Sequence, residues 1–134
     1  MRLNPTIGKR HHILVSLKKR SQFVRIAQNR NFARFPTVCV QGMHVADDSV
    51  LPQIGLTASR KVGGAVVRNR AKRRLRHAIT EILAEGCEKS AYFVLIATPA
   101  TSTCDFNQLK KDITAGMTRC RRYFKKSEKQ QDPA

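Results

Sequence analysis

The sequence between residues 54 and 76, IGLTASRKVGGAVVRNRAKRRLR, combines a strand pattern and a helix pattern in one stretch. Apolar residues alternate with small polar ones over its first part, which predicts a β-strand over residues 53–61. Two glycines, Gly63 and Gly64, interrupt this strand. The apolar residues that follow recur at helical spacing, which predicts a helix from about Ala65 to Glu85.

The predicted helix carries an unusual charge pattern. Between Lys61 and Ala78 there are seven Lys or Arg side chains, one His and no acid. Like charges four residues apart on a helix, such as Arg68 and Lys72, repel by a few tenths of a kcal/mol per pair. A bound polyanion would convert this repulsion into attraction, because phosphates exchange their counterions for basic side chains.

A helical wheel separates an apolar stripe for packing on a sheet from two basic rows. Arg68, Lys72 and Arg76 border the stripe, so that their stems can cover the sheet while their charged groups reach solvent. The opposite side carries Asn69, Arg70, Arg73, Arg74 and His77. An ordinary solvated face is the alternative. The missing acids, the excess of Arg over Lys and the glycines before the helix favour a phosphate-binding surface.

The 134 residues suit a single domain, and 41% of them are hydrophobic, which argues against global disorder.

The positive charge of the chain is concentrated in its first part. Residues 1–80 contain 17 Lys or Arg against two acids, whereas residues 81–134 contain nine against seven. This bias favours a nucleic-acid partner, with an anionic membrane surface as the second possibility.

The remaining elements follow from shorter patterns. Residues 1–12 are expected to form a basic arm, about 14–124 the ordered core, and 125–134 a polar tail. A first helix is expected over about 16–29, and Ser21 is a candidate cap for a shorter version of it. Strands are expected over 37–45 and 92–99, and a last helix is expected with Asp105 as its cap. Val38 and Val40 should point to one face of their strand, and Cys39, Gln41 and Met43 to the other.

No catalytic or metal-binding arrangement stands out in the sequence. There is no Ser/His/Asp, Cys/His or paired-carboxylate pattern, and the adjacent Asp47 and Asp48 have the composition of a turn. The four cysteines lack the spacing of a zinc site, so they are interpreted as reduced packing residues. No apolar run is long enough for a membrane span or a signal peptide, so a cytoplasmic location is expected. A small-molecule substrate is not expected.

Residues 54–76 closely resemble the signature of the bacterial ribonuclease P protein subunit. The likeness lies in a strand ending in a basic pair, a glycine turn, and a helix with the motif R-N-R-x-K-R-x-x-R, which runs from Arg68 to Arg76. It implies an α/β (α+β) sandwich of the ribosomal S5 domain 2-like type. Its mixed sheet of about four strands would pack with three helices, and its βαβ crossover would be left-handed, against the usual rule.

The resemblance also implies a function. In that family a large catalytic RNA removes the 5′ leader of precursor tRNA with Mg²⁺, which the RNA and the substrate mainly hold. The protein subunit binds this RNA and grips the leader, and no protein residue is catalytic or binds metal. The resemblance implies leader contacts by Phe23 and Val40. The implied RNA contacts are Arg60, Lys61, Arg68, Asn69, Arg70, Lys72, Arg73 and Arg76.

Two other functions remain as alternatives at this point. A basic ribosomal or other structural RNA-binding protein would share the charge and the fold class, but it does not explain the R-N-R signature. A nuclease that acts alone would need a carboxylate cluster for Mg²⁺. Residues 49–80 contain no acid, which argues against such an enzyme.

Overall fold

The computed structural model describes residues 15–17, 19–44, 53–85 and 91–131. The predicted arm at residues 1–12, Asp47, Asp48 and Cys87 lie outside these residues. The described elements are, in chain order, β1 (Val15–Ser16), α2 (Arg20–Gln28), β2 (Phe32–Arg34), β3 (Val38–His44), β4 (Gln53–Thr57), the 3₁₀ turn η1 (Arg60–Val62), α3 (Ala65–Glu85), β5 (Ala91–Ala97) and α4 (Phe106–Gln131).

The strands form one mixed sheet with the order β1-β4-β5-β3-β2. The β1–β4 and β4–β5 pairs are parallel, and the β5–β3 and β3–β2 pairs are antiparallel. The predicted α+β class is therefore confirmed. The described part of the chain has five strands instead of about four, because the short edge strands β1 and β2 add to the predicted set. The left hand of the β4–α3–β5 crossover stays a prediction.

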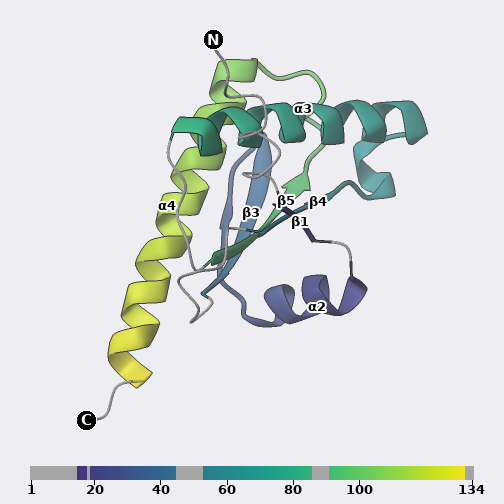
Figure 1. Ribbon diagram of the computed structural model, residues 1–134. Coiled ribbons are helices and arrows are strands. Elements are labelled where there is room, and N and C mark those ends of the chain that lie inside the picture. The colour runs from purple at the N-terminus through teal and green to yellow at the C-terminus, as the bar shows by residue number, and fades with distance from the viewer. Residues whose placement is uncertain (1–14, 18, 45–52, 86–90, 132–134) are drawn as a thin grey trace.

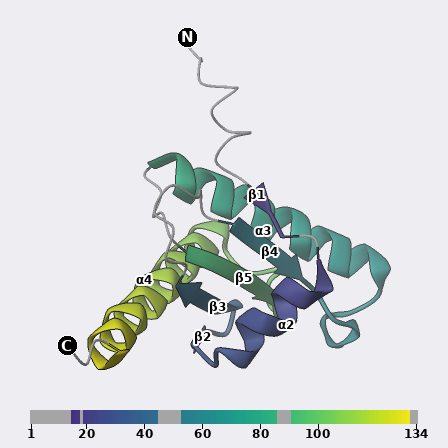
Figure 2. The same cartoon turned by 60° about the horizontal axis from the view of Figure 1, so that its bottom comes forward.

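The helices cover the two faces of the sheet unequally. Figures 1 and 2 show α2 alone on one face, whereas α3 and α4 lie together on the other. The larger apolar core fills the α3–α4 side and includes Leu75, Ile79, Phe93 and Ile113. A smaller cluster of Leu17, Ile26, Met43 and Val94 lies beneath α2. The chain therefore forms two unequal layers around one sheet.

The alternation along β3 decides which side chains meet which helix. Val38 and Val40 are fully buried in the α3–α4 core. Met43 belongs to the cluster under α2, and Cys39 and Gln41 share its side because successive strand residues point to opposite faces. The predicted alternation is confirmed.

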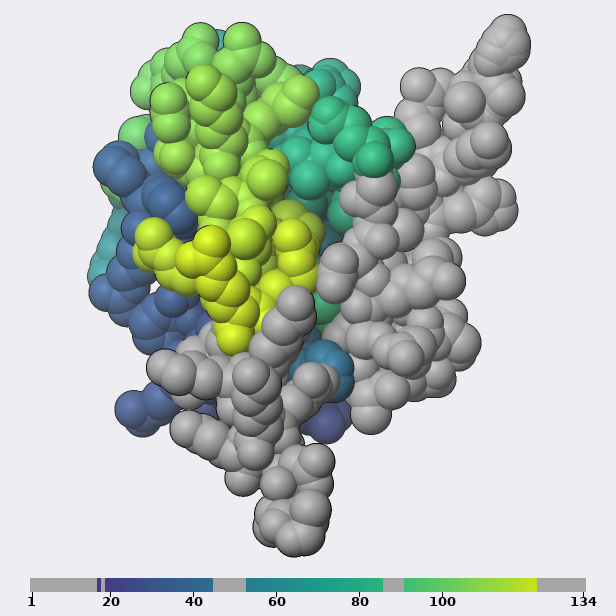
Figure 3. All heavy atoms as spheres, turned by 90° about the vertical axis from the view of Figure 1, so that its left-hand side faces the viewer, coloured from purple at the N-terminus to yellow at the C-terminus, as the bar shows by residue number. Residues whose placement is uncertain are grey.

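The last helix packs closely on β3. A Cβ atom on Gly116 would lie only 2.6 Å from Val40 Cγ2, so glycine is what lets the two backbones approach. Asp105 Oδ2 accepts a hydrogen bond from the Gln108 backbone N–H at 3.0 Å, which confirms the predicted cap. In Figure 3, α4 (yellow-green) lies between the β2–β3 segment (blue) and α3 (teal). It continues to Gln131, beyond residue 124 where the ordered core was predicted to end.

Two predicted boundaries are wrong. Helix α2 begins at Arg20 instead of 16, so Ser21 lies inside its first turn; the side chain of Gln22 accepts a hydrogen bond from the Lys19 backbone N–H instead. Strand β4 ends at Thr57 and does not continue to 61. The Ser59 hydroxyl accepts a hydrogen bond from the Lys61 backbone N–H and so starts the 3₁₀ turn η1.

Candidate nucleic-acid interface

A short turn places the first basic residues in front of α3. Arg60 and Lys61 are exposed in η1, while the neighbouring Val62 is buried and anchors the turn to the core. Gly63 has a φ of 148°, a conformation that residues with a Cβ rarely adopt. A glycine is thus needed at the point where the exposed cations of η1 end and α3 begins.

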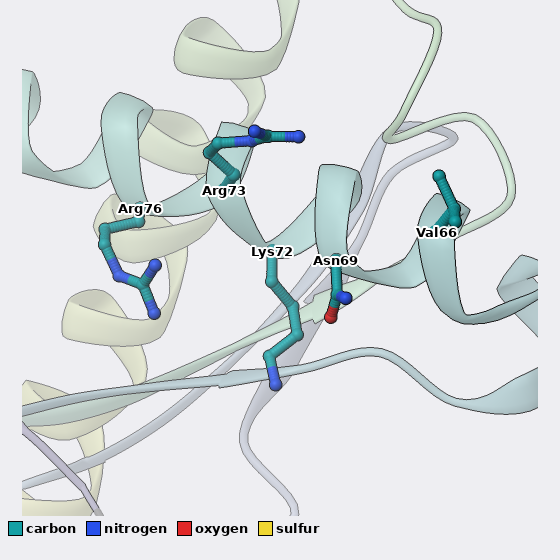
Figure 4. A pocket seen from close by; sticks show the side chains of 5 residues that line it. All are labelled: Val66, Asn69, Lys72, Arg73 and Arg76. Carbon is teal, nitrogen blue, oxygen red and sulfur yellow. The ribbon is translucent and has the colours of Figure 1, made fainter.

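The first half of α3 presents a polar, cationic surface that we call the α3 face. It is an open depression of about 520 Å³. Figure 4 shows that its side chains come from successive turns, with Asn69, Lys72 and Arg76 projecting to one side and Val66 and Arg73 to the other. The α3 face consists of Val66, Asn69, Lys72, Arg73 and Arg76.

The other two predicted contacts on α3 lie beside this face. Arg70 is exposed, whereas Arg68 is half-buried and its Nε atom is buried without a hydrogen-bond partner among the described residues. The stem of Arg68 therefore covers the edge of the core, as its position beside the apolar stripe predicted. The predicted residues thus lie on η1 and the first half of α3, which we call the basic region, with Arg68 and Arg70 beside the α3 face.

Arg74 has a structural role that the helical wheel did not predict. Its guanidinium donates hydrogen bonds to the carbonyl oxygens of Thr101 at 2.8 Å and Cys104 at 2.6 Å. It also lies 5.9 Å from the ring centroid of Phe106. Arg74 therefore ties α3 to the segment before α4, and its charge is partly used inside the protein.

The acids of α3 are kept away from the α3 face. Glu81 forms an ion pair with Lys110 of α4 at 2.8 Å, and both Glu81 and Glu85 stabilise the protonated form of Lys110, which raises its pKa. Within the described part of the chain, no carboxylate forms an ion pair with a basic residue between Arg60 and Arg76. The positive potential of that region is therefore not neutralised locally.

A second surface lies on the opposite side of the sheet, beside α2. Strand register aligns Thr57, Ile96, Cys39 and Arg34 in one row across four strands. The first three are half-buried and Arg34 is exposed, so α2 leaves this row partly open. Burial raises the pKa of the Cys39 thiol above its usual value, and the neighbouring Arg34 opposes this with a smaller decrease. We call these four residues the open row.

Phe23 lies at the edge of this second surface. Its ring packs over Gly55, where an added Cβ would lie 2.4 Å from Phe23 Cε1, and it contacts the cluster under α2. The ring is only half-buried. Phe23 is therefore a packing residue with an accessible part, which is compatible with its predicted leader contact.

The predicted contact of Val40 with a leader is wrong. Val40 is fully buried, and it packs against Gly116 of α4 on the face of the sheet opposite to α2. Periodicity correctly separated the two sides of β3 but did not indicate which side faces the first helix. The residues of β3 that share the side of Phe23 are Cys39, Gln41 and Met43.

The sequence patterns did not indicate several residues that lie exposed on the two candidate surfaces. Val66 is 81% exposed on the α3 face, although its position on the helical wheel outside the apolar stripe could have indicated this. Phe32 and Arg34 belong to β2, a three-residue edge strand that was not predicted. Edge strands this short give too few alternating positions to be recognised.

The described residues contain no group of three His, Cys, Asp or Glu side chains that could hold a metal ion. These residues therefore do not fit a protein-bound Mg²⁺. Among the same residues no helix combines the length and hydrophobicity of a membrane span. The described cysteines, Cys39, Cys104 and Cys120, are free thiols.

Comparisons with known proteins agree on one family. A family model named Ribonuclease P matches residues 14–121. The ribonuclease P protein component of Caulobacter vibrioides is 37% identical over 101 residues, which cover 75% of this chain and 67% of that protein. The component of Paramagnetospirillum magneticum is 33% identical over 108 residues, covering 77% and 80%.

Solved structures show the same fold at lower identity. The RNase P protein of Thermotoga maritima superposes with a TM-score of 0.62 at 20% identity, covering 75% of this chain and 92% of that one. A mutant of the Staphylococcus aureus RNase P protein gives a TM-score of 0.67 at 19% identity, covering 90% and 98%.

Proposed function

Because the chain belongs to the ribonuclease P protein family, we propose that it is the accessory protein subunit of a ribonucleoprotein that removes the 5′ leader of precursor tRNA. Its partners are the catalytic RNA subunit and precursor tRNA, and its location is the cytoplasm. The RNA subunit and the substrate mainly hold the Mg²⁺ and carry the reaction. The protein contributes binding and positioning.

The observation that carries this proposal is the basic region of η1 and the first half of α3. Its exposed cations form no ion pair with a carboxylate of the described residues, and its arginines offer planar groups suited to phosphate oxygens. A folded domain gains no stability from such a concentration of like charge. Binding of the RNA subunit's phosphates to the α3 face, Arg60 and Lys61 would compensate for it.

The opposite side of the sheet is proposed to hold the leader. It offers the accessible part of Phe23 and the open row, while the described part of residues 15–44 contains basic residues and no acid. An aromatic ring stacks on any base, which suits a leader without a fixed sequence. The two RNA contacts thus lie on opposite sides of one rigid sheet, which fixes their relative position.

The test is a reconstituted cleavage assay. We expect the protein alone to cleave nothing, and to increase precursor tRNA cleavage by its RNA subunit at a low Mg²⁺ concentration, where binding by the RNA is weak. RNA that copurifies with the protein should be the catalytic RNA. Copurification of ribosomal RNA instead, with no effect on cleavage, would support the alternative of a structural ribosomal protein. Cleavage by protein freed of RNA by nuclease treatment would contradict the proposal.

A further inference from the structure

An exposed aromatic ring lies at the β2 edge of the sheet. Phe32 is 41% exposed, and the guanidinium carbon of Arg34 lies 4.9 Å from its ring centroid. Two other rings of the described chain carry an arginine in this way, Phe106 and Phe35, but both are half-buried against the main core. Phe32 therefore retains an accessible surface that packing within the described residues does not use.

Strand register places this pair on the same side of the sheet as Phe23. Phe32 is opposite Gln41, Gln41 is opposite Val94, and Val94 is opposite Gly55, over which the Phe23 ring packs. Phe32 and Phe23 thus mark the two ends of one cross-strand row. Three strand spacings of about 4.8 Å place Phe32 about 14 Å from Gly55, which lies under the Phe23 ring. Arg34 also ends the open row, two residues farther along β2.

The surroundings of the pair favour an anionic partner. The described part of residues 15–44, which runs from β1 to β3, contains Lys19, Arg20, Arg25, Arg30 and Arg34 and no carboxylate. A guanidinium over a ring forms a flat cationic surface on which a nucleobase can stack, while the charge attracts the neighbouring phosphate. Single-stranded RNA combines both features, whereas an acidic peptide would use the charge alone.

We propose that Phe32 and Arg34 form a second stacking contact for the precursor tRNA leader, about 14 Å across the sheet from Phe23. The inference rests on the proposed function and deepens it. Phe23 and the open row hold one part of the leader, and a nucleotide that reaches the β2 edge stacks on the Phe32–Arg34 pair. Affinity should therefore increase in two steps as the leader is lengthened, and the second step should require Phe32.

The experiment measures holoenzyme affinity for precursor tRNAs whose leaders increase from one to about ten nucleotides. Stacking on an aromatic contributes about 1–3 kcal/mol per base, which corresponds to roughly 5- to 150-fold in Kd. Because Phe32 is only partly exposed, we expect Phe32→Leu to weaken long-leader binding by about 5- to 10-fold and to leave short-leader and leaderless binding unchanged. Val24→Ala is the matched control, since Val24 is 43% exposed on α2, and it should behave as the wild type at every length.

Arg34 variants separate stacking from charge. Arg34→Lys keeps the charge but not the planar group, so it should lose most of the long-leader gain while the salt dependence of binding stays the same. Arg34→Gln should also make the log–log salt slope shallower by about 0.7. If Arg34→Lys binds long leaders as the wild type does, and only Arg34→Gln loses affinity together with salt dependence, the pair acts as a charge without stacking and the proposal is overturned.

Other outcomes distinguish failure of the Phe32 contact from failure of the proposed leader binding. If wild-type affinity rises with leader length and Phe32→Leu follows the same curve, the second contact is absent while the proposed function survives. If the wild type shows no dependence on leader length, leader binding itself fails, and this inference fails with it. An equal loss at all lengths, or a lowered melting temperature for Phe32→Leu, would assign Phe32 to folding and also overturn the proposal.

Discussion

The close contact between Gly55 and Phe23 can be tested by adding one methyl group. In Gly55→Ala, the new Cβ would lie 2.4 and 2.7 Å from Phe23 Cε1 and Cζ, and 3.3 Å from Leu17 Cδ1. Carbon atoms in favourable contact are about 3.5–4.0 Å apart. The Phe23 ring must therefore move outward by about 1 Å, because the Gly55 backbone is held in the sheet between β1 and β5.

The expected free-energy change is the balance of two terms. Overpacking of this kind costs about 1–3 kcal/mol, whereas replacing glycine by alanine restricts the unfolded chain and gains about 0.4–1 kcal/mol. We expect Gly55→Ala to lower the free energy of unfolding by about 1–2 kcal/mol. In a Phe23→Leu background the two contacting ring atoms are absent, so the same substitution should change stability by less than about 0.5 kcal/mol.

Urea denaturation of the four proteins in this double-mutant cycle measures the coupling. The predicted coupling between positions 23 and 55 is about 1–2 kcal/mol. Gly55→Ala should also weaken binding of precursor tRNA with a leader and leave leaderless tRNA unaffected, because it displaces the Phe23 ring. An equal cost of Gly55→Ala in both backgrounds would refute the packing of this ring over Gly55.

Three further predictions concern packing, a structural arginine and a buried thiol. Gly116→Ala should destabilise the protein by about 1–2 kcal/mol in denaturant, since overpacking against Val40 outweighs the gain of up to about 1 kcal/mol in helix propensity; a stabilised variant would contradict this contact. Arg74→Ala should lower the free energy of unfolding by about 2–3 kcal/mol through the loss of two charge-assisted hydrogen bonds, while the salt dependence of RNA binding stays nearly unchanged. Burial raises the pKa of Cys120 from 9.0 to about 12, so the folded state keeps the thiol protonated while the unfolded state ionises above pH 9. Ionisation of this thiol in the unfolded state should lower the free energy of unfolding by about 1.4 kcal/mol between neutral pH and pH 10. Urea denaturation at the two pH values measures this loss, and Cys120→Ala should remove it.

The sequence predicted the elements with long, regular patterns. Helix α3 has the predicted bounds of 65–85, because the two glycines mark its start and its apolar stripe continues for several turns. Strand β5 was recognised by its continuous apolar run, which fits its central position between β4 and β3. The family also followed from the sequence, since the basic helix signature is local.

The errors arise where a residue's role depends on distant parts of the chain. The alternation of β3 cannot indicate which helix covers which side, so Val40 was assigned to the wrong surface. Arg74 resembles its neighbours on the helical wheel, and only the position of the segment containing Thr101 and Cys104 explains its role. The Phe32–Arg34 pair was missed because β2 is an edge strand defined by its pairing with β3.

The salt dependence of binding to the catalytic RNA tests the central claim most directly, namely that the basic region of η1 and α3 binds RNA phosphates. If about four to six phosphates are neutralised, the slope of log affinity against log salt should be about −3 to −5. Arg73→Ala should weaken binding and make the slope shallower by about 1. Lys111→Ala, which removes an exposed charge from α4, should leave both unchanged. An unchanged slope and affinity for Arg73→Ala would mean that the α3 face is merely solvated.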